Sequence, residues 1–157
     1  MSRRELIRMT GDEVTQFLAA SRTMTCATNG KNGWPHTMPL WFVVRQGVLW
    51  SWTFAKSQKV RNLERDPKAT VQVEAGEEYA ELRGVMLQCE VRIHRETTQV
   101  AGVGLDIAAR YGGVSRDEMP AEAHALIEKQ AAKRVALEFV EVHRATWDHR
   151  KLGAGTY

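Results

Sequence analysis

The chain contains several short segments in which apolar and polar residues alternate, as they do in strands with one buried face. The longest covers residues 81–95, where Val85, Leu87, Cys89, Val91 and Ile93 are separated by single residues. Shorter segments of strand character cover residues 22–28, 35–44, 48–53, 69–75 and 135–142. Turn signals rich in Gly and Asn, densest at residues 29–33, separate the first of them. The pattern predicts hairpins in sequence order.

Elsewhere the apolar period lengthens to that of a helix. Thr10 and Glu13 have capping-box spacing, and Val14, Phe17 and Leu18 then fall on one helix face. A second helix is predicted over residues 57–65, with Ser57 as its cap. Two more predicted helices cover residues 96–111 and 121–130. Because strands follow strands and do not alternate with helices, the predicted class is mainly β (α+β), with six or seven antiparallel strands and flanking helices.

Size and composition narrow the function classes. The 157 residues are expected to form one domain, residues 1–157. A net charge of +3, with 22 basic and 19 acidic residues, does not favour nucleic-acid binding. With no leader and no long apolar run, we expect a cytoplasmic protein without membrane contact. Cys26 and Cys89 are isolated and are expected to be free and buried.

Residue types with catalytic chemistry are scattered. The five histidines lack metal-ligand spacing, so no metal site is predicted, and no Ser/His/Asp or Cys/His constellation stands out. We therefore assign no catalytic acid, base or nucleophile. Enzymes that take their chemistry from a ring cofactor need few such groups, so this pattern is compatible with hydride transfer.

The start of the helix at residues 57–65 is the strongest candidate site. Lys59 and Arg61 lie in its first turn, where free N–H groups and the helix dipole favour a phosphate. A solvated basic helix face has the same pattern and stays open as the alternative. Trp41, Trp50 and Trp52 could form a platform for a flat ring, or simply core or interface.

Three other stretches are less distinctive. Pro39 within a strand points to a sheet edge or a bulge. Residues 76–79 are more typical of an acidic turn than of a binding site. Residues 147–152 are polar with one aromatic residue and are interpreted as a solvated tail.

The order of several motifs over roughly residues 9–152 carries a family resemblance. The most specific is Ser-x-Lys-Val-Arg-Asn-Leu-x-Arg-Asp-Pro from Ser57. Met-Pro-Leu-Trp-Phe from Met38, Glu-Leu-Arg-Gly-Val from Glu81 and Trp-Asp-x-x-Lys-Leu from Trp147 accompany it. The sequence resembles the pyridoxamine 5'-phosphate oxidase-like split β-barrel superfamily, and within it the flavin/deazaflavin oxidoreductases of the B type, which use coenzyme F420.

The resemblance implies a homodimer with two cofactor sites at the subunit interface. It makes Lys59 the main phosphate ligand, with Ser57, Arg61 and Asn62 beside it. The ring and ribityl chain would be lined by Thr37, Met38, Pro39, Leu40, Trp41, Trp52 and Thr53. Further wall residues, some of them from the partner subunit, would be Gly76, Tyr79, Arg83, Trp147 and Lys151.

The implied activity is hydride transfer from reduced F420 to a small electron-poor organic acceptor. The alternatives are an FMN-dependent oxidase or reductase on the same fold, and a non-catalytic flavin- or F420-binding protein. The chain lacks the Arg-x-Val-Leu-Leu-Lys and C-terminal Arg-Leu-x-Pro signatures of pyridoxamine phosphate oxidases, which argues against vitamin B6 oxidation.

Overall fold

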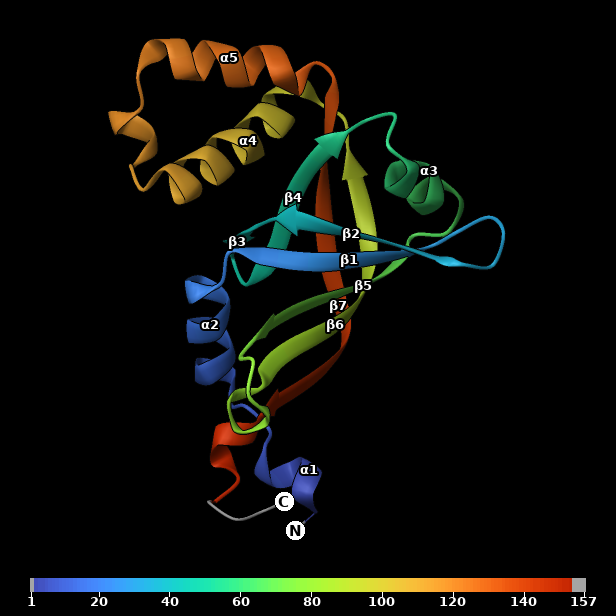
Figure 1. The fold of residues 1–157 in the computed structure, drawn as a ribbon. Helices are drawn as coiled ribbons and strands as arrows, with labels where there is room; N and C mark the ends of the chain where they lie inside the picture. Colours follow the sequence, from blue (N-terminus) through green and yellow to red (C-terminus); the bar gives the residue numbers. More distant parts are fainter. Residues whose placement is uncertain (1, 154–157) are drawn as a thin grey trace.

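Seven strands form the body of the molecule within residues 2–153, the part of the chain that the computed structural model describes (Figure 1). They are β1 (Thr23–Asn29), β2 (Pro35–Trp41), β3 (Val43–Arg45), β4 (Val48–Phe54), β5 (Lys68–Ala75), β6 (Arg83–His94) and β7 (Arg134–Asp148). The helices are α1 (Arg3–Leu6), α2 (Gly11–Ala20), α3 (Gln58–Arg65), α4 (Thr97–Gly112) and α5 (Ala121–Ala131). The short 3-10 turns are η1 (Tyr79–Glu81), η2 (Arg116–Glu118) and η3 (His149–Lys151).

The connection between β2 and β3 forces the sheet to curl. All strand pairs are antiparallel, and the order β2-β1-β5-β6-β7-β4-β3 places β2 and β3 at opposite edges. Phe42 alone joins these two edge strands. The edges must therefore approach one another, and the Ser51 hydroxyl of β4 donates a hydrogen bond to the Trp41 carbonyl of β2 at 2.7 Å. The result is the expected antiparallel α+β architecture, a half-barrel with a seam between β2 and β4.

Apolar side chains fill two regions. The inward faces of the strands form the main core, in which Met24, Phe42, Leu49 and Phe139 are almost completely buried. A second cluster lies on the outer face of β3, β4 and β7 and is covered by α4, which packs against α5 (Figure 1). The outward rings of Trp50 and Trp52 pack against this cluster. The helix pair thus adds a wall beside the seam.

Local patterns predicted most of these elements. The capping box of Thr10 and Glu13 is present at α2, and the expected apolar face of this helix is buried. The alternation along β6 and the burial of both free cysteines are confirmed. Pro39 lies on edge strand β2, in regular register opposite Thr25.

Several predicted boundaries were wrong. The strand expected at residues 35–44 breaks at Phe42, and β6 begins at Arg83 because residues 79–81 form η1. The last strand does not stop at residue 142 but pairs with β6 as far as Asp148. Ser57 occupies the N-cap position of α3, but its side chain makes no capping hydrogen bond.

Candidate functional site

The turn from β4 into α3 lies near the beginning of β2, since Gln58 and Asn62 of α3 line one hollow together with Pro35 and His36. Strand β4 ends at Phe54, and the backbone N–H of Ser57 closes the turn by donating to the Phe54 carbonyl at 3.0 Å. Asn62 is fully buried, and its amide donates to the Thr28 hydroxyl at 3.0 Å, which fixes α3 against β1. The first turn of α3 is therefore held rigidly against the sheet.

Lys59 is a buried cation without an anionic partner. Its residue is 7% exposed, and its ammonium group donates to the Thr53 hydroxyl at 3.1 Å. No carboxylate among residues 2–153 forms an ion pair with it. Burial lowers the pKa of Lys59 because it penalises the charged form. Buried charges in proteins are normally paired, so this arrangement favours an anionic ligand.

Two further polar groups in this region have no partner. The Ser57 hydroxyl oxygen is buried and forms no hydrogen bond, and no side chain caps the first N–H groups of α3. His36 Nδ1 of β2 is likewise buried and unpaired. His36 also lines a hollow of about 680 Å³ together with Gln58 and Asn62. A phosphate could accept hydrogen bonds from Ser57, Lys59 and the helix N–H groups, which are donors of the kind that helix N-termini offer to anions.

The predicted ring-lining residues follow the exposed edge of β2. Residues 37–39 and Trp41 are exposed, while Leu40 is partly buried against the core. The ring of Trp41 stacks on Tyr111 of α4, with centroids 4.3 Å apart and planes 8° apart. Because side chains alternate along β4, Trp52 faces outward, whereas Thr53 faces inward toward Lys59.

A second hollow, of about 470 Å³, lies further along β2. Pro39, Leu40, Trp41 and Trp52 line it, together with residues of α4 and α5 and the side chain of Arg134. The first turn of α3 and this hollow thus border the same strand. The contacts group the predicted residues in three sets. Pro39, Leu40, Trp41 and Trp52 share this second hollow, Lys59 contacts Thr53, and Asn62 lines the first hollow. Thr37 and Met38 lie on the same strand β2, and Ser57 and Arg61 lie at the start of α3. Arg61 is exposed there, whereas the amide of Asn62 is already engaged with Thr28.

The remaining predicted wall residues lie at the other end of the molecule (Figure 1). Strand β5 begins just after α3 and ends just before Gly76, and its eight residues span about 25 Å. Tyr79 lies beside His149, with ring centroids 4.5 Å apart, and Trp147 covers Gly84, where a Cβ atom would meet its ring at 2.3 Å. Within one chain, therefore, this second set does not meet Lys59.

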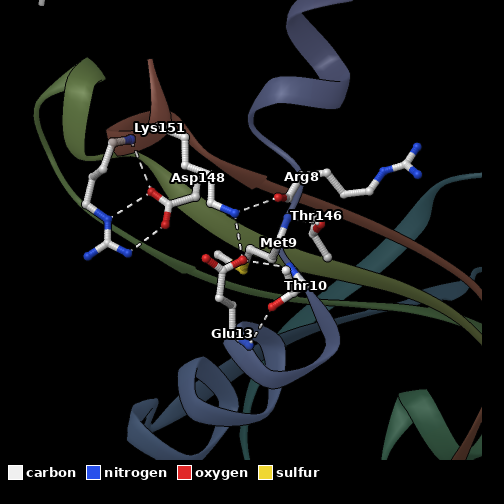
Figure 2. A network of polar contacts seen from close by, with 8 residues as sticks. Arg8, Met9, Thr10, Glu13, Thr146, Asp148 and Lys151 are labelled. Carbon is white, nitrogen blue, oxygen red and sulfur yellow. Dashed lines mark hydrogen bonds and ion pairs between the residues drawn. The ribbon is translucent and has the colours of Figure 1, made fainter. Parts of the chain in front are cut away.

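Lys151 belongs to a polar network that joins the two ends of the chain (Figure 2). Its ammonium group donates to the Glu13 carboxylate at 2.6 Å and to the Arg8 carbonyl at 2.8 Å. Asp148 is 3% exposed and accepts two hydrogen bonds from the Arg150 guanidinium, at 2.8 and 2.6 Å, which hold the pKa of Asp148 below its usual range. The interpretation of residues 147–152 as a solvated tail was wrong, because pairing with β6 and this network fix them.

Sequence reasoning missed Arg134, Tyr111 and Gly104. Tyr111 supports Trp41, and a Cβ atom at Gly104 would meet the Trp52 ring at 2.5 Å, so this glycine lets the ring lie against α4. These contacts join residues about 50 or more positions apart, and no local pattern signals them. Arg134 opens the last strand and resembles any other basic residue at a strand end.

Comparisons with known proteins identify the family and the fold. A sequence model described as pyridoxamine 5'-phosphate oxidase matches residues 10–143. The conserved hypothetical protein Rv2991 from Mycobacterium tuberculosis is 36% identical, with a TM-score of 0.89 over 100% of this chain and 96% of that one. A search of curated protein sequences found no match.

Two more distant structures share the fold. A protein described as an F420 reductase is 21% identical, with a TM-score of 0.63 over 83% of this chain and 94% of that one. An FAD-binding protein from Mesorhizobium loti is 16% identical, with a TM-score of 0.64 over 88% of this chain and 94% of that one. Among the described residues, no helix has the length and apolar character needed to cross a membrane.

Proposed function

The chain belongs to the pyridoxamine 5'-phosphate oxidase family, and from that premise we propose that it is an oxidoreductase that binds coenzyme F420 in the seam between β2 and β4. The observation that carries the proposal is Lys59, whose buried ammonium group has one hydroxyl partner and no carboxylate partner within residues 2–153. The substrate would be a small electron-poor organic acceptor.

The donor set at α3 suits the phosphate of such a cofactor. Lys59 supplies a positive charge, Ser57 an unpaired buried hydroxyl, and the start of α3 N–H groups without a side-chain cap. Hydrogen bonds from charged donors to phosphate oxygens are about twice as strong as those between neutral groups. The phosphate would in turn compensate the burial of the Lys59 charge, so the ligand and the site stabilise each other.

Strand β2 offers the features that a planar polar ring needs. It is an edge strand of the described sheet, and β1 is its only paired strand there, so backbone groups on its other side are open to a ligand apart from the Trp41 carbonyl that Ser51 contacts. Trp41, held by Tyr111, would border the ring. In its reduced form, the bound cofactor would supply a hydride to the acceptor. The protein would position the two reactants and exclude water, without a catalytic acid or base of its own.

FMN is the second candidate, because it shares the tricyclic ring and the phosphate. The deazaflavin differs by a tail with several carboxylates, which needs additional cations. Lys56 and Arg61 are exposed on either side of Ser57 and Lys59 and could serve this tail. Arg65, a third basic residue of this region, already donates to the Asn29 carbonyl. The two exposed cations favour F420 over FMN.

We also propose that the active form is a homodimer. Met38 on β2 is 43% exposed and Val142 on β7 is 67% exposed, and strands with such exposed apolar side chains are typical of interfaces. A partner subunit would bring its own Gly76, Tyr79, Trp147 and Lys151 set toward the seam. This would unite the two groups of residues that lie apart in one chain.

Titration of the protein with F420 and, separately, with FMN tests the proposal, with cofactor fluorescence as the readout. We expect F420 to bind with micromolar or lower Kd and FMN more weakly. Lys59→Met should weaken both about 10- to 100-fold, since a charged hydrogen bond contributes about 1.5–3 kcal/mol. Lys68→Met is the matched control, because Lys68 is exposed at the start of β5. This variant should bind both cofactors with the affinity of the wild type.

Each outcome has a distinct meaning. Tighter binding of FMN than of F420 would make FMN the cofactor and favour an FMN-dependent oxidase or reductase. Equal affinities for wild type and Lys59→Met would contradict the phosphate assignment. If neither cofactor binds, the proposed oxidoreductase function is wrong.

A further inference from the structure

Arg134 is a second cation that forms no ion pair with the described part of the chain, and it lies outside the proposed phosphate site. It opens β7 opposite Phe54 of β4. Its guanidinium carbon lies 4.5 Å from the centroid of the Trp52 ring and 4.1 Å from that of Phe54. Its Nε atom is buried without an acceptor, and within residues 2–153 no carboxylate forms an ion pair with it. The two aromatic rings hold the guanidinium group but offer no oxygen to its N–H donors.

The space beside Arg134 is apolar. The hollow of about 470 Å³ between β2, β4 and the α4–α5 pair is lined chiefly by Trp41, Trp52, Ile107 and other apolar or small residues. Among the described residues that line it, Gln130 has a neutral polar side chain and Arg134 alone is charged. A volume of this size suits a small organic molecule.

Gly104 contributes to the shape of this hollow. A Cβ atom at this position would lie 2.5 Å from the Trp52 ring, so a larger residue would displace the ring into the free space. Trp52 also stacks with Arg134, so the glycine keeps both the wall and the cation in place. The combination is a preformed apolar slot with a positive charge held at its side.

We propose that this slot binds an organic anion with an apolar body and one carboxylate or chemically equivalent group, and that Arg134 binds the anionic group. As part of the proposed function, this anion is the acceptor substrate, because Pro39–Trp41 belong both to the slot and to the predicted ring site. Guanidinium can bind a carboxylate through two parallel hydrogen bonds, and it is weakly hydrated, which suits a half-buried position. Burial lowers the pKa of Arg134, and a bound anion would offset this cost.

Two fluorescent probes with the same ring systems but different charge separate binding of the anionic group from binding of the apolar rings. Anilinonaphthalene sulfonate carries one negative charge, and phenylnaphthylamine carries none. Wild-type protein should bind the sulfonate. Arg134→Met, which keeps an unbranched apolar side chain, should raise the Kd of the sulfonate at least about tenfold and change that of the neutral probe less than about twofold. Lys133→Met is the matched control, because it removes an exposed charge from the neighbouring position, and it should leave both affinities unchanged.

Three results would overturn the proposal. Equal losses for the two probes in Arg134→Met would show that Arg134 shapes the slot without binding the anion. An equal loss of sulfonate binding in Lys59→Met would place the probe at the phosphate site. If Arg134→Met weakens F420 more than FMN and leaves sulfonate binding unchanged, the cation serves the carboxylates of the cofactor tail.

The test is independent of cofactor binding. The protein could bind neither F420 nor FMN while Arg134→Met still weakens binding of the sulfonate and not of the neutral probe. This result would support the anion site and contradict the proposed oxidoreductase function. Conversely, cofactor binding that depends on Lys59, with no effect of Arg134→Met on either probe, would retain the proposed function and remove the anion site.

Discussion

Lys59→Met should make the unliganded protein more stable, although it removes the hydrogen bond that the Lys59 ammonium group donates to Thr53. The side chain is buried, and methionine has a similar length without the charge. A residue whose purpose is to hold the fold together would have the opposite effect when it is replaced. The sign of the change in unfolding free energy therefore separates a ligand-binding cation from a structural one.

The magnitude follows from two opposing terms. A buried ion without a counterion costs several kcal/mol, and we take about 2–3 kcal/mol here because the Thr53 hydroxyl accepts a hydrogen bond from the ammonium group. Loss of the bond to Thr53 leaves a buried hydroxyl with fewer partners and costs about 1 kcal/mol. The net expectation is a gain of about 1–2 kcal/mol, which corresponds to a rise in Tm of roughly 2–8 °C for a domain of this size.

The pH dependence gives the same argument a second readout. Burial lowers the pKa of Lys59 in the folded state, so the protonated group destabilises the folded protein at neutral pH. This cost disappears as the pH rises from the folded pKa to the unfolded value of about 10.4. Wild-type stability should therefore rise relative to that of Lys59→Met within this alkaline window.

Urea unfolding at pH 7 and at intervals up to about pH 10, followed by tryptophan fluorescence, measures both effects. Lys68→Met, with an exposed lysine, is the control and should change the unfolding free energy by less than about 0.5 kcal/mol. A loss of more than about 1 kcal/mol in Lys59→Met at pH 7 would refute the reasoning, since Lys59 would then stabilise the fold as a structural residue.

Three other substitutions test the surroundings of the site. Asp148→Asn should destabilise the protein by about 1–3 kcal/mol at pH 7. Because the folded pKa of Asp148 is depressed, the stability of the wild type should fall toward that of the variant below about pH 4. If the unfolding free energies of the two proteins stay the same distance apart as the pH falls, this reasoning is wrong. Gly104→Ala should cost about 1–3 kcal/mol and shift the tryptophan emission, because its Cβ atom would displace the ring of Trp52; an unchanged Tm and emission maximum would disprove the close contact. Tyr111→Phe should cost about 1–3 kcal/mol in urea unfolding, because it leaves the buried N–H of Phe42 without its acceptor at 3.1 Å, and unchanged stability would show that another acceptor replaces it.

Elements with a local cause could be predicted from the sequence. The capping box at Thr10, the alternation along residues 85–93 and the short amphipathic helix after Ser57 each arise from neighbouring residues, and each is present in the structure. The proposed phosphate site also has a local basis, because Ser57 and Lys59 lie within one helical turn, and it stays a prediction. The last strand was predicted too short, since the pattern from residue 143 onward is polar and only pairing with β6 keeps it extended.

The sequence by itself determined most of the strand and helix segments, though not all of their ends, and the antiparallel class, because period, capping and turn chemistry act over a few residues. The tertiary structure decided that β2 and β3 form opposite sheet edges joined by Phe42. It also buried Lys59 and the Nε atom of Arg134, with no carboxylate of residues 2–153 in an ion pair with either side chain. It also placed Trp147 and Lys151 about a strand length away from Lys59. These facts depend on which distant segments pair and which charges lie nearby after folding, and no local pattern encodes them.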